Sequence, residues 1–219
     1  MSTETTFHDT RVTELACQWL KPDGATKLMD YFQQVFPVAQ RYGVEGKVRL
    51  VPESTPAGDL KPQVIAVLDW PGLESFDAFM EDPDYRRLYA LRDAALDRLT
   101  VTHARPIAFK PVVLSADKLY AFSGMWVRPD GGAERLIDYT CKAAPIAGDY
   151  GAKPLLEFVP LRAAYGDFLP TRVQLTEWPH HEAFGRFHAD KRVAELQPLR
   201  DSALSKLTIT LCRAQIAAH

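Results

Sequence analysis

A single histidine interrupts an otherwise apolar strand face near the end of the first half of the chain. His103 shares one side of the expected strand with Leu99 and Val101, because side chains alternate between the two faces of a strand. An imidazole among apolar neighbours can act as a general base; it can also ligate haem iron or stay a neutral, hydrogen-bonded core residue. We therefore take His103 as a candidate catalytic residue, with the core role as the alternative.

Two arginines occupy equivalent positions in the two halves of the chain. Arg92 and Arg200 each stand within a Leu-Arg-Asp sequence, on helices expected to cover a sheet. A guanidinium there can hold a carboxylate, phenolate or enolate. Arg92 is thus a candidate catalytic anion clamp and Arg200 a candidate substrate-binding residue. Because the Arg-Asp pair occurs in both halves, an ion pair that serves the fold is the alternative.

Five further polar side chains are candidates for substrate binding. Tyr42 and Tyr150 each precede a glycine at a helix end, where a phenolic hydroxyl could reach a ligand or the ring could simply pack. Arg172, Gln174 and Thr176 share one face of a strand whose counterpart in the first half is apolar. Because burying unpaired polar groups is costly, these three must be solvated, paired or used on a ligand.

Several other chemistries lack their signatures. The sequence has no phosphate-binding loop, dinucleotide fingerprint, nucleophile elbow or HExxH motif. His181 and His188 would stand about 10 Å apart along a helix, which is too far for one metal ion. The three cysteines form no C-x-x-C pair. We therefore expect neither a cofactor nor a metal site.

The two halves of the chain repeat each other. Trp70-Pro71 recurs as Trp178-Pro179, 108 positions later, and the same offset relates the stretches 28–105 and 136–213 without a gap. About 28 of these 78 positions are identical, well above the level of unrelated sequences. This agreement indicates an internal duplication.

Each repeat predicts the element order β-α-β-β-α-β, the ferredoxin-like arrangement in which two helices cover one face of a four-stranded sheet. The expected strands of the two repeats are 14–20, 47–51, 64–70 and 99–105, then 119–127, 155–159, 172–178 and 207–213. An apolar sheet face without helices needs a partner. The predicted fold is therefore α+β, with two tandem units packed sheet to sheet across a pseudo-two-fold axis.

This reading divides the chain into four parts: a polar N-terminal tail (1–12), a first unit (13–106), an extended connector (107–117) and a second unit (118–215). Because the repeat supplies its own partner, we expect a fused pseudo-dimer that is either a monomer near 24.6 kDa or a further homodimer through helices.

Composition narrows the classes of partner. A formal charge of −2 and a pI near 6.3 give no electrostatic reason to bind nucleic acid or anionic membrane. The N-terminal residues lack the apolar core of a signal peptide, and no apolar run is long enough to cross a bilayer. We therefore expect a cytoplasmic protein that acts on a small molecule.

The repeated motifs resemble those of a known superfamily. The Tyr-Gly pairs, the acidic-Trp-Pro turns (69–71, 177–179) and the Leu-Arg-Asp triplets make each unit similar to DUF1330, an uncharacterised family of the dimeric α+β barrel superfamily. The resemblance implies a barrel built from two units. It also implies function classes: cofactor-free monooxygenases, lactone isomerases, polyketide cyclases and haem-degrading enzymes. Members usually carry one unit and dimerise, so the two pockets here need not be equivalent.

These inferences favour a cofactor-independent enzyme of isomerase, cyclase or monooxygenase type that acts on a small aromatic or lactone-like substrate. The alternatives are a haem-binding or haem-degrading protein and a non-catalytic ligand carrier or scaffold. His103 occurs only in the first repeat, where Leu211 is its counterpart, so we expect the first unit to hold the reactive pocket.

Overall fold

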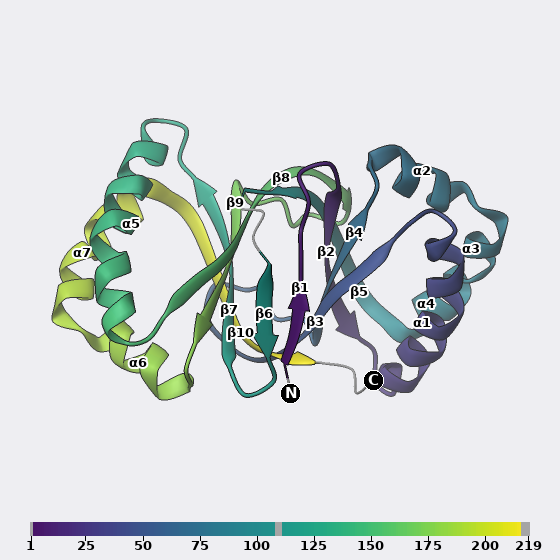
Figure 1. Cartoon of the computed structure of the whole chain (residues 1–219), viewed down its shortest axis with the longest axis horizontal. Helices are drawn as coiled ribbons and strands as arrows, with labels where there is room; N and C mark the ends of the chain where they lie inside the picture. Colours follow the sequence, from purple (N-terminus) through teal and green to yellow (C-terminus); the bar gives the residue numbers. More distant parts are fainter. Residues whose placement is uncertain (1, 108–110, 216–219) are drawn as a thin grey trace.

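The computed structural model describes residues 2–107 and 111–215, and it contains two units with the same element order (Figure 1). The first unit comprises β2 (Val12–Leu20), α1 (Gly24–Gln40), β3 (Glu45–Ala57), β4 (Val64–Trp70), α2 (Leu73–Glu81), α3 (Pro83–Arg87), α4 (Tyr89–Ala95) and β5 (Leu96–Pro106). The second comprises β7 (Leu119–Val127), α5 (Gly132–Asp149), β8 (Lys153–Tyr165), β9 (Arg172–Trp178), α6 (His181–Ala189), α7 (Lys191–Ala203) and β10 (Leu204–Gln215). The predicted α+β fold is confirmed.

The strands of both units belong to one closed barrel with the order β10-β3-β4-β2-β5-β8-β9-β7. The first unit's helices cover one side and the second unit's helices the opposite side (Figure 1). The inner faces of the two sheets meet in a shared core that includes Leu15, Ile65, Phe122 and Phe158. The expected packing of sheet against sheet therefore takes the form of a barrel in which the sheet edges are also hydrogen-bonded.

The two seams between the units repeat each other. β5 pairs with β8 at Val101 and Tyr165, and β10 pairs with β3 at the equivalent residues Ile209 and Ala57. Gly58, at φ 73°, lies so close to β10 that an added Cβ would stand 2.7 Å from a backbone oxygen. The equivalent glycine beside β5 is equally constrained. These close approaches explain why both repeats keep a Gly-Asp turn, and they describe a pseudo-two-fold relation.

Strands β3 and β8 are longer than the sequence predicts. The expected strands were 47–51 and 155–159, whereas β3 runs from Glu45 to Ala57 and β8 from Lys153 to Tyr165. The first part of each strand pairs within its own unit, and the remainder pairs mainly with the other unit's last strand. The polar, proline-containing ends become strands because a partner edge is available to them.

The N-terminal tail and the connector also meet. β1 (Ser2–Thr5) pairs antiparallel with β6 (Val112–Ser115), which the sequence did not predict. Val112 and Leu114 are buried in the barrel core, and the β1–β6 ribbon lies across the middle of the molecule in Figure 1. Residues 108–110 of the connector lie outside the described residues.

The helices that cover the two units differ in the bulk of their sheet-facing side chains. Positions Phe32, Val35 and Phe36 of α1 correspond to Thr140, Ala143 and Ala144 of α5. Smaller side chains leave more room above the sheet, and both helix–sheet layers contain a cavity. Within the described part of the chain, every helix is too short or too polar to span a membrane.

Candidate functional site

The first unit contains a cavity of about 120 Å³ between its helices and the outer face of β2, β4 and β5. Most of its walls are apolar. The lining residues with polar groups are Glu14, Gln18, Tyr31, Trp70, Tyr85, Arg92 and, from β8 of the other unit, Tyr165. A few polar groups that converge on an apolar cavity are typical of a small-molecule site.

Glu14 is the carboxyl group among the described residues that line this cavity. Trp70 Nε1 donates a hydrogen bond to Glu14 Oε2 at 2.6 Å. Burial raises the pKa of Glu14 to about 7, and the hydrogen bond from Trp70 lowers it only in part. Glu14 therefore exchanges a proton near neutral pH, where an acid–base catalyst is most effective.

Arg92 reaches the same cavity from α4. Its Nη1 donates to the hydroxyl of Tyr85 at 3.3 Å, and its Nε donates to Asp93 at 2.9 Å. The guanidinium also lies over the ring of Tyr89, 4.6 Å from the centroid. Burial raises the pKa of Tyr85, so its hydroxyl remains protonated at neutral pH. Together Arg92 and Tyr85 offer a positive charge and a phenolic hydroxyl to an anionic substrate oxygen.

Gln18 shares the cavity-facing side of β2 with Glu14. Its Oε1 is buried and has no hydrogen-bond partner among the described residues. Leaving a buried polar group unpaired costs about 1–3 kcal/mol. A ligand that hydrogen-bonds to this amide would remove that cost.

His103 is paired with Glu14 across β5 and β2, but it is not among the described residues that line the cavity. Its ring is fully buried against Phe76, with the centroids 4.3 Å apart. Arg162 Nε donates to His103 Nδ1 at 3.0 Å, so the proton of the neutral ring is on Nε2. Burial and the charge of Arg162 lower the pKa of His103 to about 4. Both ring nitrogens are thus unsuited to accept a substrate proton.

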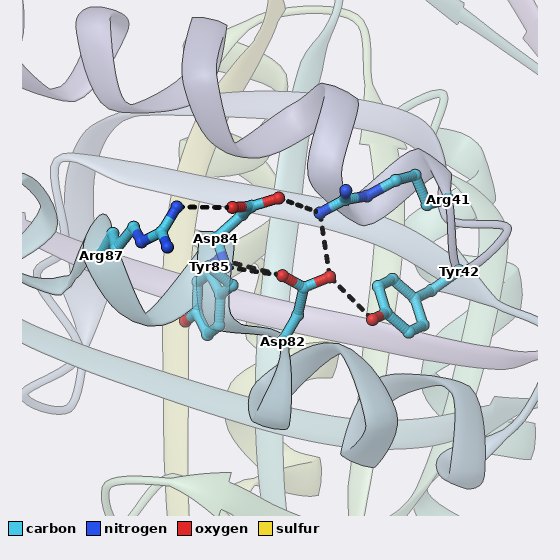
Figure 2. Close-up of polar contacts among 6 residues, drawn as sticks. All are labelled: Arg41, Tyr42, Asp82, Asp84, Tyr85 and Arg87. Carbon is cyan, nitrogen blue, oxygen red and sulfur yellow. Dashed lines mark hydrogen bonds and ion pairs between the residues drawn. The ribbon is translucent and has the colours of Figure 1, made fainter.

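Figure 2 shows the position of Tyr42 in the first unit. Its hydroxyl donates to Asp82 Oδ2 at 2.7 Å, and Arg41 donates to the same oxygen at 2.9 Å. Asp82 Oδ1 accepts backbone N–H groups from the first turn of α3, including that of Tyr85 at 3.4 Å. Tyr42 therefore holds the aspartate that caps the helix carrying Tyr85.

Tyr150 makes the equivalent contact in the second unit. Its hydroxyl donates to Asp190 Oδ2 at 2.9 Å, and Asp190 caps α7. Neither Tyr42 nor Tyr150 is among the described residues that line the two cavities. The hydroxyls predicted to bind substrate instead join the end of one helix to the start of another.

The second unit contains a cavity of about 170 Å³ in the equivalent layer. Gln174, Thr176 and Arg200, three of the residues predicted to bind substrate, line it. Arg172 is not among the described residues that line this cavity. Its Nη1 lies 3.4 Å from Glu157 Oε1 on the neighbouring strand. Of the five substrate-binding candidates in this unit, three line the cavity, whereas Tyr150 and Arg172 are not among its described lining residues.

The remaining histidines occupy separate places. His180 Nδ1 accepts the backbone N–H of Ala183 at the start of α6, and His181 Nε2 lies 2.6 Å from Glu53 Oε2. The His188 ring contacts Phe184 at a tilt of 53°, with the centroids 4.3 Å apart. In residues 2–107 and 111–215, no three His, Cys, Asp or Glu side chains are grouped so that they could hold a metal ion.

Sequence reasoning missed Glu14. The available signal was the alternation Glu14, Ala16 and Gln18, which places two polar groups on one face of an apolar strand. Their counterparts in the second unit, by strand pairing, are Ala121, Ser123 and Met125. A carboxylate that the repeated fold does not require is a candidate for function.

The fold defines the class of protein, a dimeric α+β barrel whose two units lie in one chain. Residues 19–103, which lie in the first unit, match the family model described as "Domain of unknown function (DUF1330)". A search of curated proteins finds no match.

Solved structures support the fold over the whole chain. An anthrone oxidase-like protein is 12% identical, with a TM-score of 0.65, and the match covers 98% of this chain and 95% of the other. A mutant chlorite dismutase from Candidatus Nitrospira defluvii has 8% identity and a TM-score of 0.60 over 95% and 93%. A candidate monooxygenase from Fusobacterium nucleatum subsp. nucleatum has 10% identity and a TM-score of 0.54 over 95% and 94%. At these identities the likeness concerns the fold alone.

Proposed function

We propose that the first unit holds the active site of a cofactor-independent enzyme that moves a proton on a small aromatic or lactone-like substrate. The observation that carries this proposal is Glu14, a buried carboxyl with a pKa near 7 in an apolar cavity that also contains Arg92 and Tyr85. The reaction type is isomerisation, cyclisation or monooxygenation, because all three begin with the same proton transfer.

In the proposed reaction, ionised Glu14 takes a proton from an acidic C–H bond beside a carbonyl group. The electron pair of that bond moves onto the carbonyl oxygen and forms an enolate. Arg92 and Tyr85 stabilise this negative charge, which is larger in the transition state than in the substrate. An isomerase completes the cycle when protonated Glu14 returns the proton to another carbon. A monooxygenase would instead let dioxygen, as co-substrate, add to the enolate carbon; the resulting peroxide takes up a proton, and loss of water leaves a new carbonyl group that keeps one of the two oxygen atoms.

This assignment moves the base from His103 to Glu14. His103 already accepts a hydrogen bond from Arg162 and has a pKa near 4, whereas Glu14 lines the cavity. The haem alternative meets the same difficulty in this unit, because an axial ligand needs an accessible ring nitrogen and the Nε2 of His103 is buried. The structural relatives described as anthrone oxidase-like and as a candidate monooxygenase support small-molecule chemistry on this fold.

The test is hydrogen–deuterium exchange of 2-indanone, a small ketone with acidic C–H bonds, followed by NMR in D₂O. The wild-type protein should accelerate exchange above the buffer rate. Glu14→Gln should remove most of that acceleration, about 10²-fold or more, because it deletes the base and keeps an acceptor for Trp70. Glu195→Gln on exposed α7 is the matched control and should behave as wild type.

Two further variants separate the candidate residues. His103→Leu should retain exchange, and Arg92→Met should reduce it through loss of the anion clamp. An inactive His103→Leu beside an active Glu14→Gln would return the base to His103. Loss of exchange in Arg200→Met, with Glu14→Gln active, would move the site to the second unit, whose cavity Arg200 lines. No acceleration by the wild type, with bound 2-indanone, would favour the carrier alternative.

A further inference from the structure

The two tryptophans that end β4 and β9 have the same surroundings. Trp70 pairs with the first residue of β2, and Trp178 with the first residue of β7. The rings of Trp70 and Phe76 lie 5.3 Å apart at 89°, and those of Trp178 and Phe184 lie 5.3 Å apart at 81°. Each tryptophan also contacts a second phenylalanine, with ring centroids 5.1 Å apart for Trp70 and Phe79 and 5.2 Å apart for Trp178 and Phe187. The two indoles are therefore oriented alike within their units.

Only one of the two indoles has a hydrogen-bond acceptor. Trp70 Nε1 donates to Glu14, whereas Trp178 Nε1 is buried without a partner among the described residues. The position equivalent to Glu14 is Ala121, since Glu14 pairs with Leu68 and Ala121 with the equivalent residue of β9. The Trp178 N–H thus points toward the space that a carboxylate fills in the first unit.

That space belongs to the 170 Å³ cavity of the second unit, because Ala121 and Trp178 both line it. Cavities of about 150 Å³ accept a ligand of the size of benzene. The described lining residues include Arg200 but no aspartate or glutamate, so the charged group that lines the cavity is a guanidinium, which also donates to Asp201 at 2.9 Å. Burial and the charge of Arg200 lower the pKa of His188, so its ring is neutral at pH 7. Gln174 and Thr176 add polar groups to otherwise apolar walls.

We propose that the second unit binds a small aromatic carboxylate, whose carboxylate oxygen accepts the Trp178 N–H in the position that Glu14 occupies in the first unit. The ligand would supply the acceptor that Ala121 lacks, and its ring would fill the apolar part of the cavity. This site is separate from the proposed catalytic cavity, and it stands whether or not the first unit is an enzyme.

The test uses phenylacetate as the probe and the indole N–H signals of the ¹⁵N-labelled protein as the readout. Trp178→Phe assigns the Trp178 signal, because one indole peak disappears. Phenylacetate should shift that signal downfield, as expected when an N–H gains a charged acceptor, and should leave the Trp70 signal in place. The neutral analogue 2-phenylethanol should bind at least threefold more weakly.

Two variants decide whether the acceptor position is the binding site. Ala121→Glu introduces the first unit's own carboxylate and should weaken phenylacetate binding at least tenfold, and Trp178→Phe should weaken it by a similar factor. Glu195→Gln, on the exposed side of α7, is the control and should leave the affinity unchanged. Binding that persists in Trp178→Phe, an unshifted Trp178 signal at millimolar phenylacetate, or equal binding of 2-phenylethanol would overturn the proposal.

Discussion

At the scale of single residues, Glu14 and His103 form a cross-strand pair with opposite pH behaviour. Burial raises the pKa of Glu14 to about 7 and lowers that of His103 to about 4, so both groups are neutral between these values. Their counterparts, Ala121 and Leu211, cannot titrate. The first unit therefore carries a titratable pair that the repeated fold does without.

Glu14→Gln should stabilise the protein at alkaline pH. The unfolded carboxyl ionises near pH 4.5 but the folded one near 7, so wild-type stability falls as the pH rises through this window. The full loss, up to about 3 kcal/mol, is present above pH 7. Urea unfolding at pH 5 and pH 8 should show that the free energy of unfolding of the variant rises relative to that of the wild type at pH 8. An equal difference at both values would contradict the raised pKa.

His103→Leu should make the stability of the protein less dependent on pH below about 6.5. The folded imidazole has a pKa near 4 and the unfolded one near 6.5, so wild-type stability falls as the pH drops from 6.5 toward 4. In the wild type this loss of stability amounts to up to about 3 kcal/mol, and the leucine variant should not show it. The variant should fold at neutral pH because Leu211 already occupies the equivalent site. Thermal unfolding between pH 7.5 and pH 5 measures the difference. A variant as acid-sensitive as wild type would argue against the lowered pKa.

At the scale of elements, the contact between Tyr42 and Asp82 joins the end of α1 to the start of α3 (Figure 2). Tyr42→Phe should cost about 1 kcal/mol through the lost hydrogen bond, and Asp82→Ala about 1–2 kcal/mol through the lost cap. Because they share one contact, the double variant should lose less than the two single losses combined. Urea unfolding of all four proteins measures the coupling, and simple additivity would show that the contact contributes nothing.

The elements also mark how far the sequence alone reaches. Apolar periodicity and the repeat predicted the element order, because each unit's amphipathic pattern is local. The extra length of β3 and β8 could not be predicted, since residues such as Pro52 enter a strand only beside the other unit. Gln174, Thr176 and Arg200, each a candidate for substrate binding from the sequence, line one cavity, and their role in binding stays a prediction. Glu14 was missed because its importance depends on Trp70, 56 residues away.

At the scale of the whole molecule, the closed barrel bears on oligomeric state. Each barrel strand is hydrogen-bonded on both sides within one chain, so the described barrel offers no free edge to another copy. We expect a monomer near 24.6 kDa in size-exclusion chromatography with light scattering. A stable species of twice that mass would point to association through the helices, which cover both outer sides (Figure 1).

One polar connection occurs at only one of the two seams. Arg162 of β8 reaches across to His103 and to Asp77 of α2, where Nη1 and Oδ2 lie 3.2 Å apart. At the other seam the equivalents of these residues are Ser54, Leu211 and Gly185. A symmetric homodimer would contain any such connection twice or not at all.

The two seams between the halves of the chain therefore differ in their polar contacts. A first half that met a second copy of itself would place His103 opposite Ser54 and leave Nδ1 without the guanidinium of Arg162. In the single chain each first half meets a second half, so Arg162 is always present beside His103. Selection can then alter one pocket without imposing the same change on its twin.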